Sequence, residues 1–506
     1  MARTSVAHWL IAIAALGGVS APLRAQCPDG TPPPCAGAAA TAHPAPNSIA
    51  VLTFENTTRD TSAQYLVEGL ADQIATRLGG VARLTMISRS VVRRLRNPQQ
   101  QSIQQIGRSL NAAYLVNGAI RTASGRVRVN VEAVRAATGE AVWSEAYDRA
   151  SDDLIGLEEA IATEVAAGVA GRLSPQERRA LGSGVTTNSR AYEQFLRGNL
   201  LLARRTSASM QGAITAYRAA AGADSGFADG YARLAYAYAL CAWFTCGGDV
   251  DSLLALARLA TARALRANPR SSDAWMSQAL TLTVSSVWST ITTRPGVDDS
   301  ILASIAAFRR AVDLNPRNDE AWHQYGATLR LVSDSASLDA LRRALALDPA
   351  RAVSYVDLAI TYTRMGRVDL ARESIDSALM LEPDGPFRFL RVYIRLALGD
   401  TAGALADARV TPNLSPDLMA RLFRDSTSVR LMESEVAHPQ CSDQVANYLL
   451  WTGRREQAVQ SELQCRPSLW TRMSLRRPEA AAIADDPRIQ ALRAETERIL
   501  ATARWR

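Results

Sequence analysis

Lysine is absent from this chain of 506 residues, so all 57 basic residues are arginine. This absence excludes the sites that depend on a lysine amine, which are the Walker-type phosphate loop, the kinase-type ATP site and the Schiff-base enzyme. Histidine occurs only four times, and because His8 lies in a predicted signal peptide and His43 in a predicted linker, a multi-histidine metal site is excluded. A Ser-His-Asp group would have to use His323 or His438. No G-x-S-x-G, H-E-x-x-H or G-x-G-x-x-G motif occurs, and the sequence therefore predicts no enzyme, no cofactor and no metal.

Aromatic residues make up only 6% of the chain, and its net charge of +8 is small for its length. A nucleic-acid-binding domain usually carries a dense basic patch, so this weak excess predicts no nucleic-acid partner. Alanine and leucine dominate the second half. Because both are strong helix formers, that half is expected to form closely packed helices.

The first residues have the pattern of a secretory signal peptide. Arg3 precedes an apolar stretch from Trp9 to Val19, and small residues lead to Ala25, where we expect cleavage. Because the stretch is too short to span a bilayer and no later segment is long and apolar enough, no integral membrane segment is expected after cleavage. Residues 26–47 are rich in proline and predict an extended linker. Cys27 raises a lipoprotein alternative, which the preceding Arg24-Ala25-Gln26 disfavours.

The six cysteines fall as three pairs of near neighbours: Cys27 with Cys35, Cys241 with Cys246, and Cys441 with Cys465. Six thiols allow 15 connectivities, so spacing alone does not fix the pairing. Export to an oxidising compartment favours disulfides over free thiols. For the last pair, an antiparallel helical hairpin would place the two sulfur atoms side by side.

Residues 48–182 alternate short β-type runs with helical periodicity, and Val127, Val129 and Val131 alternate strictly with polar residues. Turns at Ser124-Gly125 and Thr138-Gly139 indicate two hairpins. The predicted order is β-α-β-α-β-β-β-α, a compact α/β domain with a mixed sheet. Its predicted elements are strands 48–54, 83–87, 113–122, 127–133 and 141–147, and helices 65–78, 103–110 and 154–173.

A short helix ending recurs through the second half. It occurs at Ala264 to Pro269, Ala311 to Pro316, Ala344 to Pro349 and Ala378 to Pro383. The last two intervals are close to 34 residues, a period typical of a repeat with two helices per unit. Such arrays bury a core shared between neighbouring units and usually bind other molecules. Residues 186–475 are therefore expected to form a helical solenoid, and residues 476–506 a C-terminal helical cap.

The first part of the chain resembles a known family. The resemblance rests on five ordered motifs: Ser48 to Asn56, Glu68-Gly69-Leu70, Ile87-Ser88-Arg89, Ile106 to Gly118, and Ala137 to Arg149. Together they are similar to the TolB-like amino-terminal domain that precedes tetratricopeptide repeats in bacterial proteins. In those relatives the domain often follows a nucleotide cyclase, a kinase or a winged-helix domain. Here a predicted signal peptide stands in that place.

The second half resembles the tetratricopeptide repeat (TPR) itself. In the clearest unit Tyr355, Leu358-Ala359 and Tyr362 take the bulky and inner positions of the first helix, and Gly366 the break between helices. By analogy with the family, certain first-helix side chains are expected to face a concave groove that binds a protein or peptide partner. They are Asp229, Tyr236, Asp273, Met276, Glu320, His323 and Arg330.

The fold expected from the sequence is thus an α/β domain with a mixed sheet followed by an all-α TPR solenoid. The expected function is that of a non-enzymatic exported scaffold, periplasmic or associated with the cell envelope, that uses the α/β domain as a docking module. An alternative function is a small-ligand sensory module derived from cyclase- or kinase-linked receptors. The sequence names neither the partner nor the oligomeric state.

Overall fold

A computed structural model describes most of the chain after the first 43 residues. The described residues are 44–58, 64–95, 98–150, 152–182, 186–244, 246–292, 299–383, 387–411, 414–437, 443–465, 475 and 478–502. The predicted signal peptide, nearly all of the linker, and Cys27, Cys35 and Cys441 lie outside them. Within the described part no helix is both long and apolar enough to cross a membrane.

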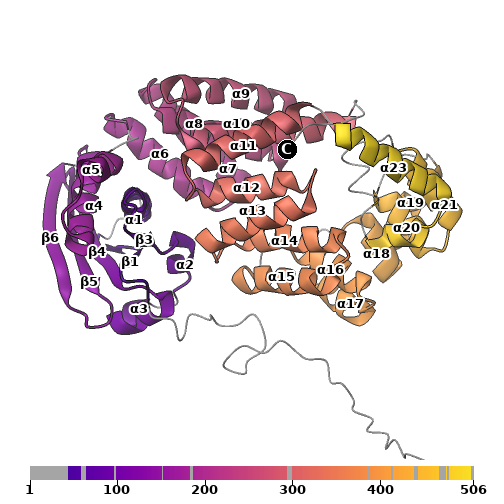
Figure 1. Cartoon of the computed structure of the whole chain (residues 1–506), viewed down its shortest axis with the longest axis horizontal. Helices are drawn as coiled ribbons and strands as arrows, with labels where there is room; N and C mark the ends of the chain where they lie inside the picture. The colour runs from indigo at the N-terminus through magenta and orange to yellow at the C-terminus, as the bar shows by residue number, and fades with distance from the viewer. Residues whose placement is uncertain are drawn as a thin grey trace, which may run out of the picture. The chain divides into compact units, whose positions relative to one another are not determined.

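The first described region is a mixed β-sheet with helices on both faces (Figure 1). Its strands are β1 (Ser48–Val51), β2 (Glu55–Asn56), β3 (Thr85–Met86), β4 (Tyr114–Ala123), β5 (Arg126–Arg135) and β6 (Ala141–Ala150). The spatial order is β3-β1-β4-β5-β6, with β2 pairing with β4. β1 pairs in parallel with β3 and β4, whereas β4, β5 and β6 form two antiparallel hairpins. The predicted mixed sheet and its order of elements are confirmed.

Each face of the sheet is covered by its own pair of helices. α1 (Gln64–Gly79) and α4 (Leu154–Ala170) pack with the buried valines of β5 on one face. α2 (Arg89–Arg93) and α3 (Ile103–Leu110), on either side of the short helix η3 (Pro98–Gln100), cover the other face through Val92, Ile106 and Leu110. Along β5, Val127, Val129 and Val131 therefore face the first core, whereas the polar residues between them are exposed and only Val134, after a β-bulge, joins the second core.

Several predicted boundaries in this region were wrong, and the short helix α2 was not predicted. The strand predicted for 48–54 breaks after Val51, where Leu52 leaves β1 and bonds to Val116, and pairing resumes at β2. The strand predicted for 83–87 shortens to β3. The helix predicted for 154–173 ends at Ala170, because Gly171 takes a positive φ of 74°.

From residue 175 onward the described chain is helical, with successive helices packed as pairs (Figure 1). The helices are α5 (Pro175–Gly182), α6 (Ser189–Leu202), α7 (Ser207–Ala223), α8 (Ala228–Trp243), α9 (Val250–Ala267), α10 (Ser272–Thr292), α11 (Asp299–Leu314), α12 (Asp319–Leu329), α13 (Asp334–Leu347), α14 (Ala352–Arg364), α15 (Val368–Leu381), α16 (Arg388–Ala397), α17 (Thr401–Arg409), α18 (Pro416–Phe423), α19 (Ser426–Ala437), α20 (Asp443–Trp451), α21 (Arg455–Leu463), η4 (Pro478–Ile483) and α23 (Pro487–Thr502). The predicted α/β domain followed by a TPR solenoid is thus the observed architecture.

The recurring tag is the carboxyl end of every second helix. In each copy the amide of the residue before proline donates to the carbonyl of the tag alanine, at 2.8 Å for Asn268 and Asp348 and 3.0 Å for Asn315. The tag alanines, including Ala264 and Ala344, are fully buried. Proline then prevents the helix from continuing. The tag therefore sets where one repeat ends and the next begins.

The aromatic residue at the start of the next helix binds back to this tag. Trp275 Nε1 donates to the carbonyl of Pro269 at 2.9 Å, and Trp322 Nε1 donates to that of Pro316 at 3.0 Å. The same bond in two successive units fixes the angle between consecutive repeats. These tryptophans pack partly buried against the core, as expected for structural residues.

Gly326 permits the close approach of paired helices. A Cβ atom at this position would lie 2.7 Å from Leu341 Cγ on α13 and 3.1 Å from the backbone nitrogen of the same residue. Only a residue without a side chain fits this gap. The sequence pattern did not reveal the helices from α16 to α19, although α16 has a strongly amphipathic face with Val392, Ile394 and Leu396 buried.

Candidate functional site

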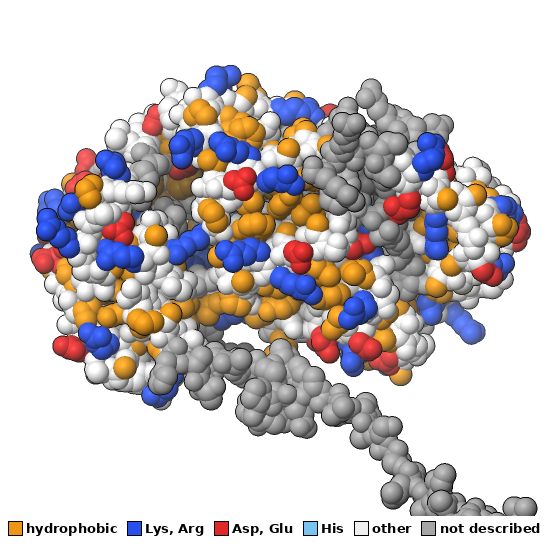
Figure 2. Space-filling model, viewed as in Figure 1, with side chains coloured by type: hydrophobic (Ala, Val, Ile, Leu, Met, Phe, Trp, Pro, Cys, Tyr) orange, Lys and Arg blue, Asp and Glu red, His pale blue; other side chains and the backbone are white. Residues whose placement is uncertain are grey.

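Charged and polar side chains gather on the helices α8, α12 and α14 and on three arginines outside them, and we call this set the groove network. Its members are Arg205, Tyr236, Asp319, Glu320, His323, Gln324, Arg330, Arg351, Ser354 and Asp357. Tyr236, Glu320, His323 and Arg330 belong to the predicted set, and the structure brings these four into one network. Figure 2 shows basic and acidic side chains side by side in the centre of the view, over the helices that Figure 1 labels α12 to α14.

Glu320, in the first turn of α12, is the centre of the network. One carboxylate oxygen lies 3.2 Å from Arg205 Nη2 and the other 2.8 Å from Arg351 Nη1. The hydroxyl of Tyr236 on α8 donates to the same carboxylate, and Gln324 donates to that hydroxyl at 2.9 Å. The two arginines hold the pKa of Glu320 well below its usual range, although burial acts in the opposite direction. Glu320 is therefore a fixed anion that ties α12 to three other helix pairs of the array.

A second part of the network surrounds His323. Its Nδ1 lies 3.1 Å from the hydroxyl of Ser354 and 3.7 Å from a carboxylate oxygen of Asp357 on α14. Arg330 at the end of α12 donates to the other oxygen of Asp357. Burial lowers the pKa of His323 to about 4, so its imidazole is neutral at pH 7. A neutral imidazole held in this way positions α14 against α12.

Asp229 and Asp273 lie beside the network on the first turns of α8 and α10. Asn318 Nδ2 donates to Asp273 Oδ1 at 2.9 Å, which ties α10 to the start of α12. Burial, followed by the charge of Asp273, raises the pKa of Asp229 to about 7, and Arg233 opposes this rise. Asp229 consequently changes its charge near neutral pH.

Three members of the predicted set, Tyr236, Met276 and His323, are buried more deeply than a binding surface requires. Met276 is fully buried among core residues, because its position on α10 faces the neighbouring helices. Its side chain is therefore not available to a partner, which corrects the expectation that it faces the groove. Tyr236 is also fully buried, and its hydroxyl is bonded to Glu320, Gln324 and Arg205 within the network.

Sequence reasoning missed the cations that complete the network. Arg205 lies in the turn after α6, in a left-handed conformation with a φ of 53°, and its charge reaches Glu320 across 115 residues of chain. Arg351 immediately precedes α14 and also binds Asp319. Neither lies on a first-helix position of the repeat pattern. A positive φ and a position in a turn do not indicate, from the sequence, that Arg205 pairs with Glu320.

The network combines fixed geometry with partial access to solvent. The side chains of Arg205 and Asp319 keep 34% and 33% of their exposure, whereas those of Glu320 and Arg351 keep 17% and 15%. Peptide groups and charged side chains can bind at the exposed atoms while the buried atoms stay in place. Among the described residues no group of three or more acidic, histidine or cysteine side chains has the geometry of a metal site.

A second buried charge cluster joins the α/β region to the first repeat. Tyr192 on α6 donates to Glu158 on α4, and Arg77 Nε on α1 lies 3.7 Å from the same carboxylate. Burial raises the pKa of Glu158 to about 8 despite these neighbours. Together with the packing of Leu196 against Gly69, the cluster couples α1, α4 and α6.

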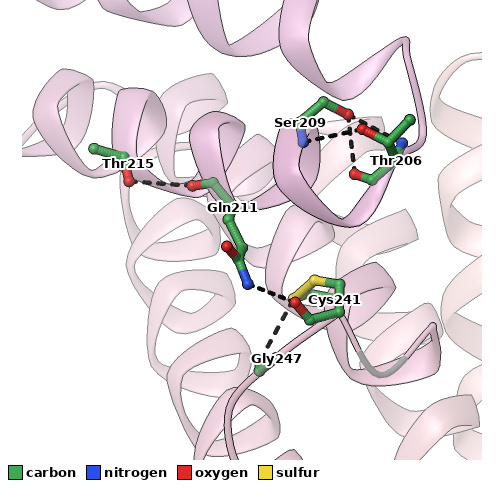
Figure 3. Close-up of a disulfide and its surroundings, with 7 residues drawn as sticks. Thr206, Ser209, Gln211, Thr215, Cys241 and Gly247 are labelled. Atoms are coloured by element: carbon green, nitrogen blue, oxygen red, sulfur yellow. Dashed lines mark hydrogen bonds between the residues drawn. A yellow bond between two sulfur atoms is a disulfide. The ribbon is translucent and has the colours of Figure 1, made fainter.

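Cys241 and Cys246 lie at disulfide distance where α8 gives way to a loop, and their Cα atoms are 5.0 Å apart (Figure 3). Gln211 on α7 donates to the carbonyl of Cys246 at 2.5 Å. The loop is thus held against the preceding repeat. The pairing of the other four cysteines stays a prediction, because three of them lie outside the described residues.

Residues 45–164 match the family described as "HilA/YgeH-like transcriptional regulator, second domain". The chain is also 29% identical over 156 residues to "Putative adenylate cyclase 3" of Rhizobium meliloti (strain 1021). That alignment covers 30% of this chain and 26% of the relative, so the chain spans about a quarter of the relative's length. The resemblance to the TolB-like domain stays a prediction.

Among solved structures, a thermophilic TPR protein of Thermus thermophilus is 20% identical with a TM-score of 0.33, covering 41% of this chain and 98% of that one. YrrB, described as "a TPR protein with an unusual peptide-binding site", is 21% identical with a TM-score of 0.25, covering 39% and 89%. At these values the likenesses carry no argument about what this chain binds.

Proposed function

We propose that the chain is a non-enzymatic scaffold that binds a peptide segment of a protein partner along the groove network. The observation that supports this best is the set of partly exposed, pre-paired charges that Arg205 and Arg351 form with Asp319 and Glu320 at the start of α12. A rigid set of donors and acceptors costs little entropy to align with an extended peptide. The mixed charges favour a segment with both acidic and basic residues.

We further propose that residues 48–182 act as a TolB-like docking module and that residues 1–25 export the chain to the periplasm or cell envelope. The near-neighbour cysteines support export, because paired cysteines at disulfide distance suit an oxidising compartment. The assignment of 186–475 to the repeats and of 476–506 to the cap belongs to the same proposal.

Peptide selection on the full chain tests the groove. A displayed library of random dodecapeptides would be enriched on the purified protein, and the enriched peptides would be titrated against an Arg205→Gln/Asp319→Asn variant. These two are the most exposed charged members of the network, so the variant is expected to keep its fold, which circular dichroism checks. We expect at least a tenfold loss of affinity. Unchanged affinity in the folded variant would remove the groove from the proposal.

A second candidate function is a regulatory module that senses a small ligand through the α/β region. The observation that favours it is the match of this region to the second domain of a family of transcriptional regulators. The name of the partly aligned cyclase relative points in the same direction. A thermal-shift screen of the full chain against nucleotides and cell-wall fragments tests it. A ligand at 100 times its Kd adds about 2.7 kcal/mol of stability, and no shift with any ligand would count against sensing.

A further inference from the structure

A pocket of about 220 Å³ opens between α7 and α9, with α8 beneath it. It is lined by Arg218, Ala221, Gly222, Tyr231, Leu234, Tyr238, Leu256, Leu259, Ala260 and Arg263. This lining shares no residue with the groove network, so the pocket is separate from the proposed peptide site. We call it the α7–α9 pocket.

The floor and rim of the pocket are apolar. Leu234 and Tyr238 are buried at its base, whereas Leu256 and Leu259 at the rim are 43% and 52% exposed. These two leucines lie three residues apart and therefore on the same face of α9. A helix that exposes neighbouring leucines beside a concave pocket leaves apolar surface that a ligand would cover.

Both charged residues of the lining are arginines. Arg263 donates to the hydroxyl of Tyr231 at 3.3 Å and lies over its ring, with Cζ 5.5 Å from the centroid. Arg218 makes no hydrogen bond or ion pair with any residue that the structure describes. Within the described part of the chain, no acidic residue lines the pocket. The arginines of the groove network, in contrast, all face carboxylates. The arginines of the α7–α9 pocket have no such counter-charge among the described residues and can therefore bind an anion.

Gly222 keeps the pocket open. A Cβ atom built at this position meets nothing within 4 Å, and the residue lies in regular helix near the end of α7. The glycine is thus not required by the backbone or by a close neighbour. A larger side chain here would enter the pocket without straining the helix.

We propose that the α7–α9 pocket binds a small amphiphile with one carboxylate and an unbranched apolar chain, of the medium-chain fatty acid class. The carboxylate would be held by Arg218 and Arg263, and the chain would lie on Leu234, Tyr238, Leu256 and Leu259. The small volume of the pocket excludes drug-sized ligands. The two charges exclude a neutral hydrocarbon as the preferred occupant.

Titration of the full chain with octanoate, followed by calorimetry, tests this proposal. We expect saturable 1:1 binding, with octanol of the same chain length at least tenfold weaker, because it offers no charge to the arginines. Arg218→Gln should weaken octanoate about tenfold and leave octanol unchanged. Gly222→Leu should abolish the binding of both, and Leu259→Gln, an exposed change that the fold tolerates, should weaken both equally.

Equal affinity for octanoate and octanol would overturn the anionic assignment. Octanoate binding that persists unchanged in both Gly222→Leu and Leu259→Gln would overturn the location. A tetrapeptide ending in leucine that competes with octanoate and binds more than tenfold tighter would replace the fatty acid by a protein carboxyl terminus. The groove variant Arg205→Gln/Asp319→Asn serves as the matched control and should bind octanoate normally, so this test and that of the peptide groove fail independently.

Discussion

The groove network and the α7–α9 pocket both contain arginines, but the arginines have different neighbours in the two regions. In the groove network every arginine faces a carboxylate, and Glu320 alone receives two of them. In the pocket Arg218 and Arg263 share the surface with leucines and tyrosines, and no acidic residue of the described chain lines it. Paired charges fix the relative positions of repeats, whereas charges beside apolar surface are free to receive a ligand. The comparison therefore separates a structural and recognition surface from a small-molecule site.

The sharpest way to break this comparison is to neutralise one charge in each region. Glu320→Gln leaves Arg205 and Arg351 with a weaker, neutral partner in a largely enclosed site, and we expect a loss of about 3 kcal/mol in the free energy of unfolding. Arg218→Gln, at an exposed position, should change it by less than about 0.5 kcal/mol. Urea unfolding of both variants measures the difference. Equal midpoints would contradict the distinction.

Acid should affect the groove network and spare the pocket. The pKa of His323 is about 4 in the folded chain and about 6.5 when exposed, so its contribution is complete above pH 6.5 and is lost as the pH falls through 4. A depression of this size corresponds to about 3 kcal/mol at most. His323→Gln should remove that part of the acid dependence of Tm between pH 6.5 and 4. An identical pH profile in the variant would show that His323 is not buried neutral.

Alanine substitutions at two glycines, one in each region, are expected to change the free energy of unfolding in opposite directions. Gly326→Ala places a Cβ atom 2.7 Å from Leu341, and the crowding should lower the free energy of unfolding by about 1–3 kcal/mol. Gly222→Ala meets open space in a helix and should raise it by about 0.5 kcal/mol. Thermal unfolding measured side by side decides the matter. Destabilisation by Gly222→Ala would mean that other atoms lie against Gly222 and close the wall of the pocket.

The smallest expected effect on stability is the difference between two tyrosine-to-phenylalanine variants of α8. Tyr236→Phe removes the hydroxyl that joins Glu320 to Gln324 and should cost about 1 kcal/mol. For Tyr238, the described residues offer its hydroxyl no hydrogen bond, so Tyr238→Phe should be neutral within about 0.3 kcal/mol. Denaturant midpoints of the two variants, measured in parallel, provide the check. A larger cost for Tyr238→Phe would reverse the assignment of the polar network to one side of α8.

Much of the fold was predictable because its signals are local. The tag from Ala344 to Pro349 marks a helix end through one hydrogen bond and one proline, and the alternation of Val127, Val129 and Val131 marks a half-buried strand. Strand ends were less predictable, because pairing partners decide where β1 stops. The helices around α16 lack the tag and escaped notice.

The candidate site was predictable only in part. Position within the repeat pointed to Glu320 and His323, and both lie in the groove network. Their partners were not predictable, since Arg205 stands in a turn and the curvature of the array, not sequence proximity, brings it to Glu320. The burial of Met276 depends on how α8 and α10 pack, which periodicity does not specify.

The central claim is that the groove network holds a peptide, and competition on the full chain tests it most directly. A fluorescent dodecapeptide obtained by selection would be titrated against the wild type, Arg205→Gln/Asp319→Asn, and the pocket variant Arg218→Gln. We expect the groove variant to bind at least tenfold more weakly and the pocket variant to match the wild type. Equal binding by all three folded proteins, or failure of any peptide to enrich over an unrelated protein, would contradict the claim.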